Sequence, residues 1–305
     1  MEFKIEENQN VEIKLVEGED VLAGATCFYA GTPEVNGQRI GTIGELTISD
    51  NEVGVKLLDE CERILKEKGV KQIVAPMNGN TWKQYRSLKW SNGDAPFVME
   101  KVSPVEYNEV FEKAGFKEID EYTSTKGKVK DYFDNEILDE IEKRLADENI
   151  TIRKFEKAKA VEELKKIYNV SVKSFCRNPF YTPIDEDNFI AQYTPFIEMV
   201  DDELILLAEK DGEEIGFLFA IPDFNEMQTK GKMSTLILKT IAVLPEYEDM
   251  AIGNVMTRMI AKKAIDKGFE DWIFAFMFKD NTSQKLAERN GTQTMREYVL
   301  FGKDL

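Results

Sequence analysis

The feature that most constrains the fold of this chain is an internal duplication of one strand–helix–strand unit. Gly54 opens a helical pattern that ends at Gly69, Gly253 opens another that ends at Gly268, and fifteen positions separate the two glycines in each pair. A strand-like segment precedes each helix, and another, QIVAP or WIFAF, follows it. A later short helical pattern also ends in glycine in each half. The same parts in the same order predict two copies of one α/β unit.

The other periodic segments extend this pattern over the whole chain. Short apolar or alternating runs predict strands at 11–16, 21–30, 39–49, 73–76 and around Tyr122 in the first half, and at 151–155, 203–222 (a hairpin), 237–243, 272–278 and 296–301 in the second. We therefore expect an α/β (α+β) fold of two lobes, each a mixed, mostly antiparallel sheet flanked by helices. The expected limits are 1–128 for the first lobe, 129–150 for a connecting helix and 151–305 for the second lobe.

The composition excludes several kinds of chemistry. The 305 residues include no histidine, so a histidine base, a Ser–His or Cys–His pair and a histidine-containing metal site are excluded, and no metal site is expected. The formal net charge of −17 disfavours nucleic acid as a partner and favours a cationic substrate such as an amine. Three scattered cysteines, no signal-peptide pattern and no apolar run of about 20 residues predict a cytoplasmic protein that does not enter a membrane.

The strongest local signal is the segment 241–254, IAVLPEYEDMAIGN. A strand ends at Val243, Pro245 follows, and a loop leads to Gly253 at the start of a helix. Backbone N–H groups in the first turn of a helix lack intrahelical partners and carry the positive end of the helix dipole, so they suit a phosphate or diphosphate. Ala251 and Gly253 have little or no side chain to keep such a group away. The alternative is an ordinary strand–loop–helix connection.

This segment resembles the acetyl-CoA signature of the GNAT N-acetyltransferase superfamily, V-x-P followed by Arg/Gln-x-x-Gly-x-Gly/Ala. The stretch 280–291, DNTSQKLAERNG, is similar to the second motif of that superfamily, and VKQIVAPMNGNTW with YNEVFEKAGF is similar to the first lobe of tandem GNAT proteins. The resemblance implies two GNAT-like lobes in tandem and an acetyl-CoA site. The cofactor contacts that it implies are Ile241, Ala242, Val243, Met250, Ala251, Ile252, Gly253, Asn254, Asn281 and Ser283.

The same resemblance favours the C-terminal lobe as the cofactor lobe. The connection from the last strand residue to the helix glycine spans 6 positions in the first lobe, Ile48 to Gly54, and 10 in the second, Val243 to Gly253. The missing residues would wrap the diphosphate, so we expect the first lobe to be degenerate.

Two departures from the superfamily pattern bear on activity. Glu248 stands where the superfamily has arginine or glutamine, and at an exposed position we expect its repulsion to cost about 1 kcal/mol or less. The tyrosine that many members use to protonate the leaving thiolate aligns with Ala287 in the second lobe and Phe111 in the first. Tyr298, on the last strand, is then the hydroxyl that we nominate as catalytic proton donor; the alternative is a packed strand aromatic.

Residues 76–86, PMNGNTWKQYR, are the second unusual segment because they combine amides, aromatics and a cation directly after a core strand. Such a mixture suits recognition of a small polar ligand at a cleft between lobes. The predicted substrate contacts are Asn78, Asn80, Trp82, Tyr85 and Arg86. The alternative is a structural loop whose aromatic side chains cover the core.

These features predict an acyl-CoA-dependent N-acyltransferase, in the simplest case an acetyltransferase, that acts on a small-molecule or peptide amine by direct attack. An alternative from another class is a catalytically inactive module that binds CoA or a small ligand. A third is an aminoacyl- or lipid-transfer enzyme, of which a tRNA-using version conflicts with the negative charge of the chain.

Overall fold

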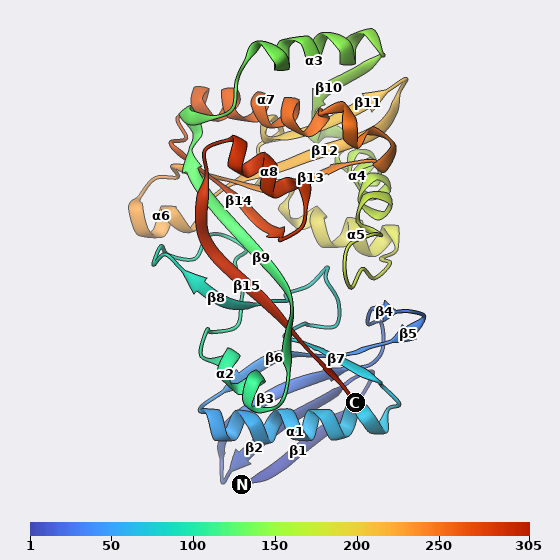
Figure 1. Cartoon of the computed structure of the whole chain (residues 1–305), viewed down its shortest axis with the longest axis vertical. Helices are drawn as coiled ribbons and strands as arrows, with labels where there is room; N and C mark the ends of the chain where they lie inside the picture. Colours follow the sequence, from blue (N-terminus) through green and yellow to red (C-terminus); the bar gives the residue numbers. More distant parts are fainter.

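The computed structural model describes residues 1–305 and arranges them as two α/β lobes, one above the other in Figure 1. The first part of the chain forms β1 (Glu2–Glu7), β2 (Val11–Glu17), β3 (Asp20–Phe28), the hairpin β4 (Glu34–Val35) and β5 (Gln38–Arg39), β6 (Gly41–Ile48), α1 (Asn51–Glu67), β7 (Gln72–Ala75), β8 (Ser87–Ser91), α2 (Tyr107–Lys113) and β9 (Lys117–Lys128). The second part forms α3 (Glu136–Asp147), β10 (Ile150–Lys154), α4 (Ala160–Phe175), α5 (Glu186–Tyr193), β11 (Ile205–Lys210), β12 (Glu213–Pro222), α6 (Asn225–Lys230), β13 (Thr235–Val243), α7 (Ile252–Asp266), β14 (Asp271–Phe278), α8 (Thr282–Arg289) and β15 (Gln293–Asp304).

The two helices predicted from the glycine repeat are α1 and α7. Each begins within a few residues of the predicted start, and each is followed by a glycine with positive φ, +80° at Gly69 and +84° at Gly268. Only glycine adopts this left-handed conformation without strain, and this is why the same residue ends both helices. One face of each helix is buried against the sheet.

One sheet of thirteen strands runs through both lobes. Its order is β1-β2-β3-β6-β7-β15-β9-β14-β13-β12-β11-β10, and β8 also pairs with β15. The last strand of each half crosses into the other half: β9 pairs with β14 of the second lobe, and β15 pairs with β7 of the first. The chain therefore ends inside the first lobe, as Figure 1 shows. The predicted fold class is confirmed, and the two expected sheets are continuous because the lobes exchange their last strands.

Each lobe contains one pair of parallel strands that separate after a short ladder. β6 and β7 are paired only over residues 41–42 and 73–74, and β13 and β14 over 235–238 and 271–274. Beyond Leu238, β13 stays paired with β12 while the end of β14 pairs with β9. A register shift against β12 leaves Lys239 without a cross-strand partner at the point where the two strands separate.

The segment predicted to connect the lobes contains α3, which packs against α7. Arg258 of α7 is 2% exposed and forms ion pairs with Asp134 at 3.1 Å, Asp139 at 2.8 Å and Glu142 at 2.6 Å. Because one buried guanidinium binds three carboxylates of this segment, α3 is held on the second lobe. The domain limits 1–128, 129–150 and 151–305 remain a prediction.

The sequence patterns did not reveal β1 and β8. Every residue of β1 is exposed, since it lies at the edge of the sheet. Among the helices, none combines the length and the apolar character that a membrane span requires.

Candidate functional site

The first turn of α7 is an uncapped helix start. Ala251 lies between the 3₁₀ turn Pro245–Met250 and α7 in a left-handed conformation (φ 61°, ψ 22°), and no side chain caps the helix. The backbone N–H of Ala251 has no backbone acceptor. A Cβ placed on Gly253 would meet only Ile241 Cγ2, at 3.6 Å, so the space beside this turn is open. Free N–H groups beside open space fit the diphosphate of a nucleotide.

The equivalent corner of the first lobe is closed. The carboxylate of Asp50 accepts the N–H of Val53 at 3.0 Å and so occupies the start of α1. A Cβ on Gly54 would lie only 2.6 Å from Val110 Cγ1. The split between β6 and β7 is filled by Asn78, whose Oδ1 accepts the Glu45 N–H at 2.8 Å. The two helix starts therefore differ although their glycine spacing is the same. The start of α7 has room for an anion, whereas the start of α1 is already occupied by the Asp50 carboxylate.

Glu248, which we expected to repel a diphosphate, is paired with a cation. Its carboxylate forms an ion pair with Arg177, which follows α4, and both side chains are exposed. Arg144 of α3 donates to the carbonyl of Met250 at 3.4 Å. Arg177 thus offsets the charge of Glu248, and Arg144 brings positive charge to the approach to α7. Neither arginine was predicted because each lies far from this loop in sequence.

Of the remaining predicted cofactor residues, three lie at the split and two lie at the start of α8. Ile241, Ala242 and Val243 belong to the part of β13 that has left β14. The Val243 carbonyl accepts the Ser174 hydroxyl at 3.1 Å. Asn281 caps α8, where its Oδ1 accepts the N–H of Ser283 at 3.4 Å.

Asn254, in the first turn of α7, has a buried Oδ1 without a hydrogen-bond partner. Rotation of this amide by 180° would place its NH₂ donors there instead. The amide of Asn254 therefore has an unused hydrogen-bonding group in the first turn of α7, where we expect the diphosphate.

An apolar cavity lies beside β12 and β13. It is lined by Trp82, Phe155, Leu164, Ile167, Ser171, Phe175, Phe189, Tyr193, Phe196, Ile197, Val200, Ile205, Phe217, Phe219 and Thr240. Trp82 comes from the first lobe; its indole N–H donates to the Thr182 carbonyl at 2.7 Å, and its ring meets Phe189 edge-on at 5.9 Å. Thr240 lies directly beyond the point where β13 leaves β14, so the cavity reaches the split.

The five residues predicted to contact substrate divide into two groups. Asn78 is bonded within the first lobe, and the Oδ1 of Asn80 accepts the N–H of Trp82 at 3.1 Å, so both amides serve the loop itself. Trp82, Tyr85 and Arg86 instead meet side chains beyond the loop. Tyr85 packs edge-on against Tyr122 of β9, and the Arg86 guanidinium stacks on the Tyr85 ring at 3.6 Å.

Lys239 joins Arg86 at the ring of Phe276, and sequence analysis did not single it out. The Lys239 ammonium lies 5.3 Å from the centre of that ring, and the Arg86 guanidinium lies 4.9 Å from it. Burial and, secondarily, the positive charge of Arg86 together lower the pKa of Lys239 to about 8. The signal that could have revealed it is a single lysine inside the apolar strand TLILKTIAV.

Tyr298 is completely buried. Its hydroxyl donates to Glu100 Oε1 at 2.6 Å and lies 3.1 Å from the hydroxyl of Ser124. Burial and the charge of Glu100 raise the pKa of Tyr298. Its role as a proton donor remains a prediction, to be tested by whether Tyr298→Phe slows thiol release. Ala287 and Phe111, which stand at the usual tyrosine positions, are fully buried as well.

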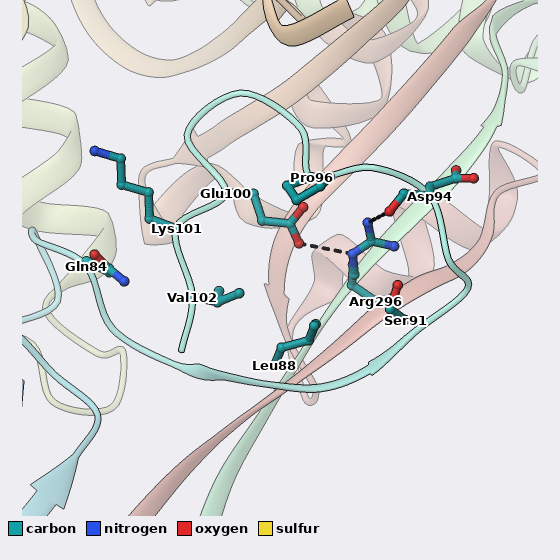
Figure 2. Close-up of a pocket in the computed structure, with 9 residues that line it drawn as sticks. All are labelled: Gln84, Leu88, Ser91, Asp94, Pro96, Glu100, Lys101, Val102 and Arg296. Carbon is teal, nitrogen blue, oxygen red and sulfur yellow. Dashed lines mark hydrogen bonds and ion pairs between the residues drawn. The ribbon is translucent and has the colours of Figure 1, made fainter. Parts of the chain in front are cut away.

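A second cavity, of about 460 Å³, lies between β15 and the 92–102 segment (Figure 2). Arg296 is its central cation: its Nε pairs with Glu100 at 3.2 Å, its Nη1 donates to Asn92 at 2.9 Å, and its Nη2 donates to the carbonyls of Asp94 and Ala95. In Figure 2 the Lys101 side chain points away from this guanidinium. Because the buried charges are already bonded to each other, the cavity is polar but has no free central charge for a ligand.

Asp120 of β9 is a partly buried carboxyl whose Oδ2 has no hydrogen-bond partner. Burial and the nearby Asp280 raise its pKa from 3.8 to about 6. The folded protein thus holds this proton more tightly than the unfolded chain, so stability falls as the pH rises from about 4 to about 6 and stays lower above that. A pKa shift of about two units corresponds to about 3 kcal/mol of folding free energy. Because the carboxyl is only partly buried, we expect about 1–2 kcal/mol.

We therefore expect Asp120→Asn to raise the free energy of unfolding by about 1–2 kcal/mol at pH 7.5 and to change it little at pH 4. Urea denaturation at the two pH values measures the difference. An equal effect at both pH values would show that ionisation of Asp120 does not destabilise the fold.

The fold combines duplicated α/β lobes, a parallel strand pair that separates and an open helix start. Comparison with known protein families shows where the same combination occurs. Residues 164–292 match the model of the acetyltransferase (GNAT) family. The second lobe is therefore a GNAT domain, and the chain has the architecture of a tandem GNAT protein. No curated protein matches the chain in sequence.

Three solved structures show the same fold over 97% of this chain. They are a GCN5-related N-acetyltransferase from Sphaerobacter thermophilus (12% identity, TM-score 0.57), a tandem GNAT protein from the clavulanic acid biosynthesis pathway (10%, 0.54) and a fungal protein with a GCN5-related glucosamine N-acetyltransferase region (16%, 0.61). The match covers 81% and 82% of the first two chains, but this chain spans only 33% of the multi-domain fungal protein. At these identities the likeness concerns the fold alone.

Proposed function

We propose that this protein is an acyl-CoA-dependent N-acyltransferase whose acetyl-CoA site lies in the second lobe and whose acceptor is an amine. The observation that carries the proposal is the difference between the two helix starts. The start of α7 is uncapped and open at Gly253, whereas the start of α1 holds the Asp50 carboxylate and is crowded at Gly54. The open start belongs to the segment that matches the GNAT family model.

Each part of the split would have a distinct role. The N–H groups from Met250 to Gly253 would bind the diphosphate, whereas the Asn254 N–H already donates to the Ala251 carbonyl at 3.0 Å. The free edge of β13 at 241–243 would pair with the pantetheine arm. Acetyl-CoA, when bound, supplies an acyl group activated as a thioester. A backbone N–H beyond the split would polarise the thioester carbonyl, and the apolar walls at Trp82 and Phe219 would exclude water from the acceptor.

Calorimetric titration with acetyl-CoA, followed by an assay of thiol release against a panel of amines, tests the proposal. We expect acetyl-CoA to bind in competition with CoA, and we expect thiol release to depend on the presence of an amine. If acetyl-CoA does not bind, the proposal fails.

The alternative of an inactive CoA-binding module is favoured by one observation, the absence of the usual tyrosine from both lobes. Ala287 and Phe111 are buried and carry no hydroxyl, so neither side chain can supply the proton. Tight acetyl-CoA binding without thiol release for any amine would favour this alternative.

A further inference from the structure

Arg86 and Lys239 form a pair of cations without a carboxylate partner. They approach the same Phe276 ring from different parts of the chain, Arg86 from the loop of the first lobe and Lys239 from β13 of the second. The Nε of Arg86 is buried and has no hydrogen-bond partner, and its only side-chain bond is to the Tyr85 hydroxyl. Both side chains are half-buried, and two half-buried positive charges that repel each other are costly unless an anion joins them.

Other buried or half-buried arginines of this acidic chain are neutralised. Arg153 pairs with Glu163 and Glu209, Arg258 with three carboxylates, and Arg296 with Glu100. Asp120, the partly buried carboxyl on β9, forms no ion pair with Arg86 or Lys239, and its Oδ2 has no hydrogen-bond partner. In a chain of net charge −17, this unpaired cluster is therefore exceptional.

The two cations lie close to the point where β13 separates from β14. Lys239 is the bulged residue where β13 separates from β14, and Thr240, the next residue, lines the apolar cavity. Phe219 lines that cavity too and packs in the same cluster as Phe276. The cations, the split and the cavity are thus contiguous. A ligand that meets all three must carry an anion close to its reacting nitrogen and an apolar group beside both.

We propose that the acceptor is an α-amino acid with an apolar side chain, whose carboxylate binds Arg86 and Lys239 and whose side chain enters the cavity closed by Trp82. This inference rests on the proposed function. The cavity, of about 80 Å³, is about half the size of an engineered cavity that holds benzene, so it suits an aliphatic chain such as that of leucine. A bidentate guanidinium–carboxylate pair fixes the orientation of the acceptor.

The reaction balances without a further reactant. The amino group loses one proton to solvent, and its nitrogen attacks the thioester carbon. An amide bond forms while the carbon–sulfur bond breaks, and the leaving thiolate takes a second proton from the nitrogen. The products are an N-acyl amino acid and CoA with a free thiol.

A panel of three compounds tests the proposal on the intact protein. Leucine, leucinamide and 3-methylbutylamine share the side chain, but only leucine carries a carboxylate. In the presence of CoA, we expect leucine to bind at least 10-fold more tightly than either analogue by calorimetry, and to give at least a 10-fold higher kcat/KM for thiol release. The binding measurement is decisive even if the protein lacks turnover.

Arg86→Gln should reduce the preference for leucine over 3-methylbutylamine at least 10-fold while the acetyl-CoA dissociation constant stays the same. Lys83→Gln is the matched control, since Lys83 is an exposed cation of the same loop, and it should preserve the preference. Equal binding of the three compounds, or an undiminished preference in Arg86→Gln, would overturn the proposal. Failure of acetyl-CoA to bind the native protein would instead reject the proposed function, so the two failures are distinguishable.

Discussion

Replacing Gly253 with aspartate is expected to weaken acetyl-CoA binding by at least about 100-fold and to leave the protein folded. The new carboxylate would stand beside the N–H groups that we expect to hold the diphosphate. Two unit charges about 4 Å apart repel by about 4 kcal/mol near a protein surface, and each 1.4 kcal/mol is about tenfold in affinity. The structure has room for the side chain, because a Cβ at Gly253 meets only Ile241 Cγ2, at 3.6 Å.

Gly253→Asn is the matched control because it has almost the same size without the charge. We expect it to weaken binding by about tenfold or less, so that the difference between the two variants isolates the electrostatic part. Asparagine and aspartate are both tolerated in the first turn of a helix, and aspartate interacts favourably with the helix dipole, so thermal unfolding should show no loss of stability. Undiminished affinity of Gly253→Asp, measured by calorimetry, would place the cofactor elsewhere.

Phe301→Ala is expected to destabilise the first lobe, although residue 301 lies at the end of the second half of the sequence. Phe301 is fully buried and stacks on Phe111 of α2, with ring centres 4.9 Å apart. Truncation of such a side chain leaves a cavity and costs about 3–5 kcal/mol. Urea denaturation should show this loss, and hydrogen exchange should become faster in α1 and β3, which belong to the same apolar cluster.

Phe3→Ala provides the comparison, since Phe3 lies on the edge strand β1 and is 36% exposed. We expect it to cost less than about 1 kcal/mol. If Phe301→Ala accelerated hydrogen exchange only within residues 151–305, the placement of β15 in the first lobe would be wrong.

The repeated glycines predicted much of the fold correctly because the signals that end a helix are local. α1 and α7 have the predicted positions, and the hairpin of β11 and β12 has its turn at Asp211 and Gly212, both with positive φ. By contrast, the crossing of β9 and β15 depends on pairing between strands about 170 residues apart, and no local pattern encodes that register.

The candidate site was predicted in part for the same reason. The segment 241–254 has a sequence signature, so its residues could be nominated directly. Whether its helix start was open could not be predicted, because this depends on what lies in front of it: in the first lobe Asp50 and Val110 fill the space, and in the second nothing does. Arg177, which neutralises Glu248, is likewise brought there by packing of α4 against the sheet.

The amino-acid sequence alone determined that this protein has two related α/β units and no histidine chemistry, and it predicted one loop as the site of a nucleotide diphosphate. These properties follow from residue type and short-range spacing, which act within a few residues along the chain. Only the tertiary structure decided that the units share one sheet, that Tyr298 is buried beside Glu100, and that Arg86 and Lys239 meet at Phe276. Such contacts join side chains far apart in sequence, and they form only when the strands of both lobes assemble into one sheet.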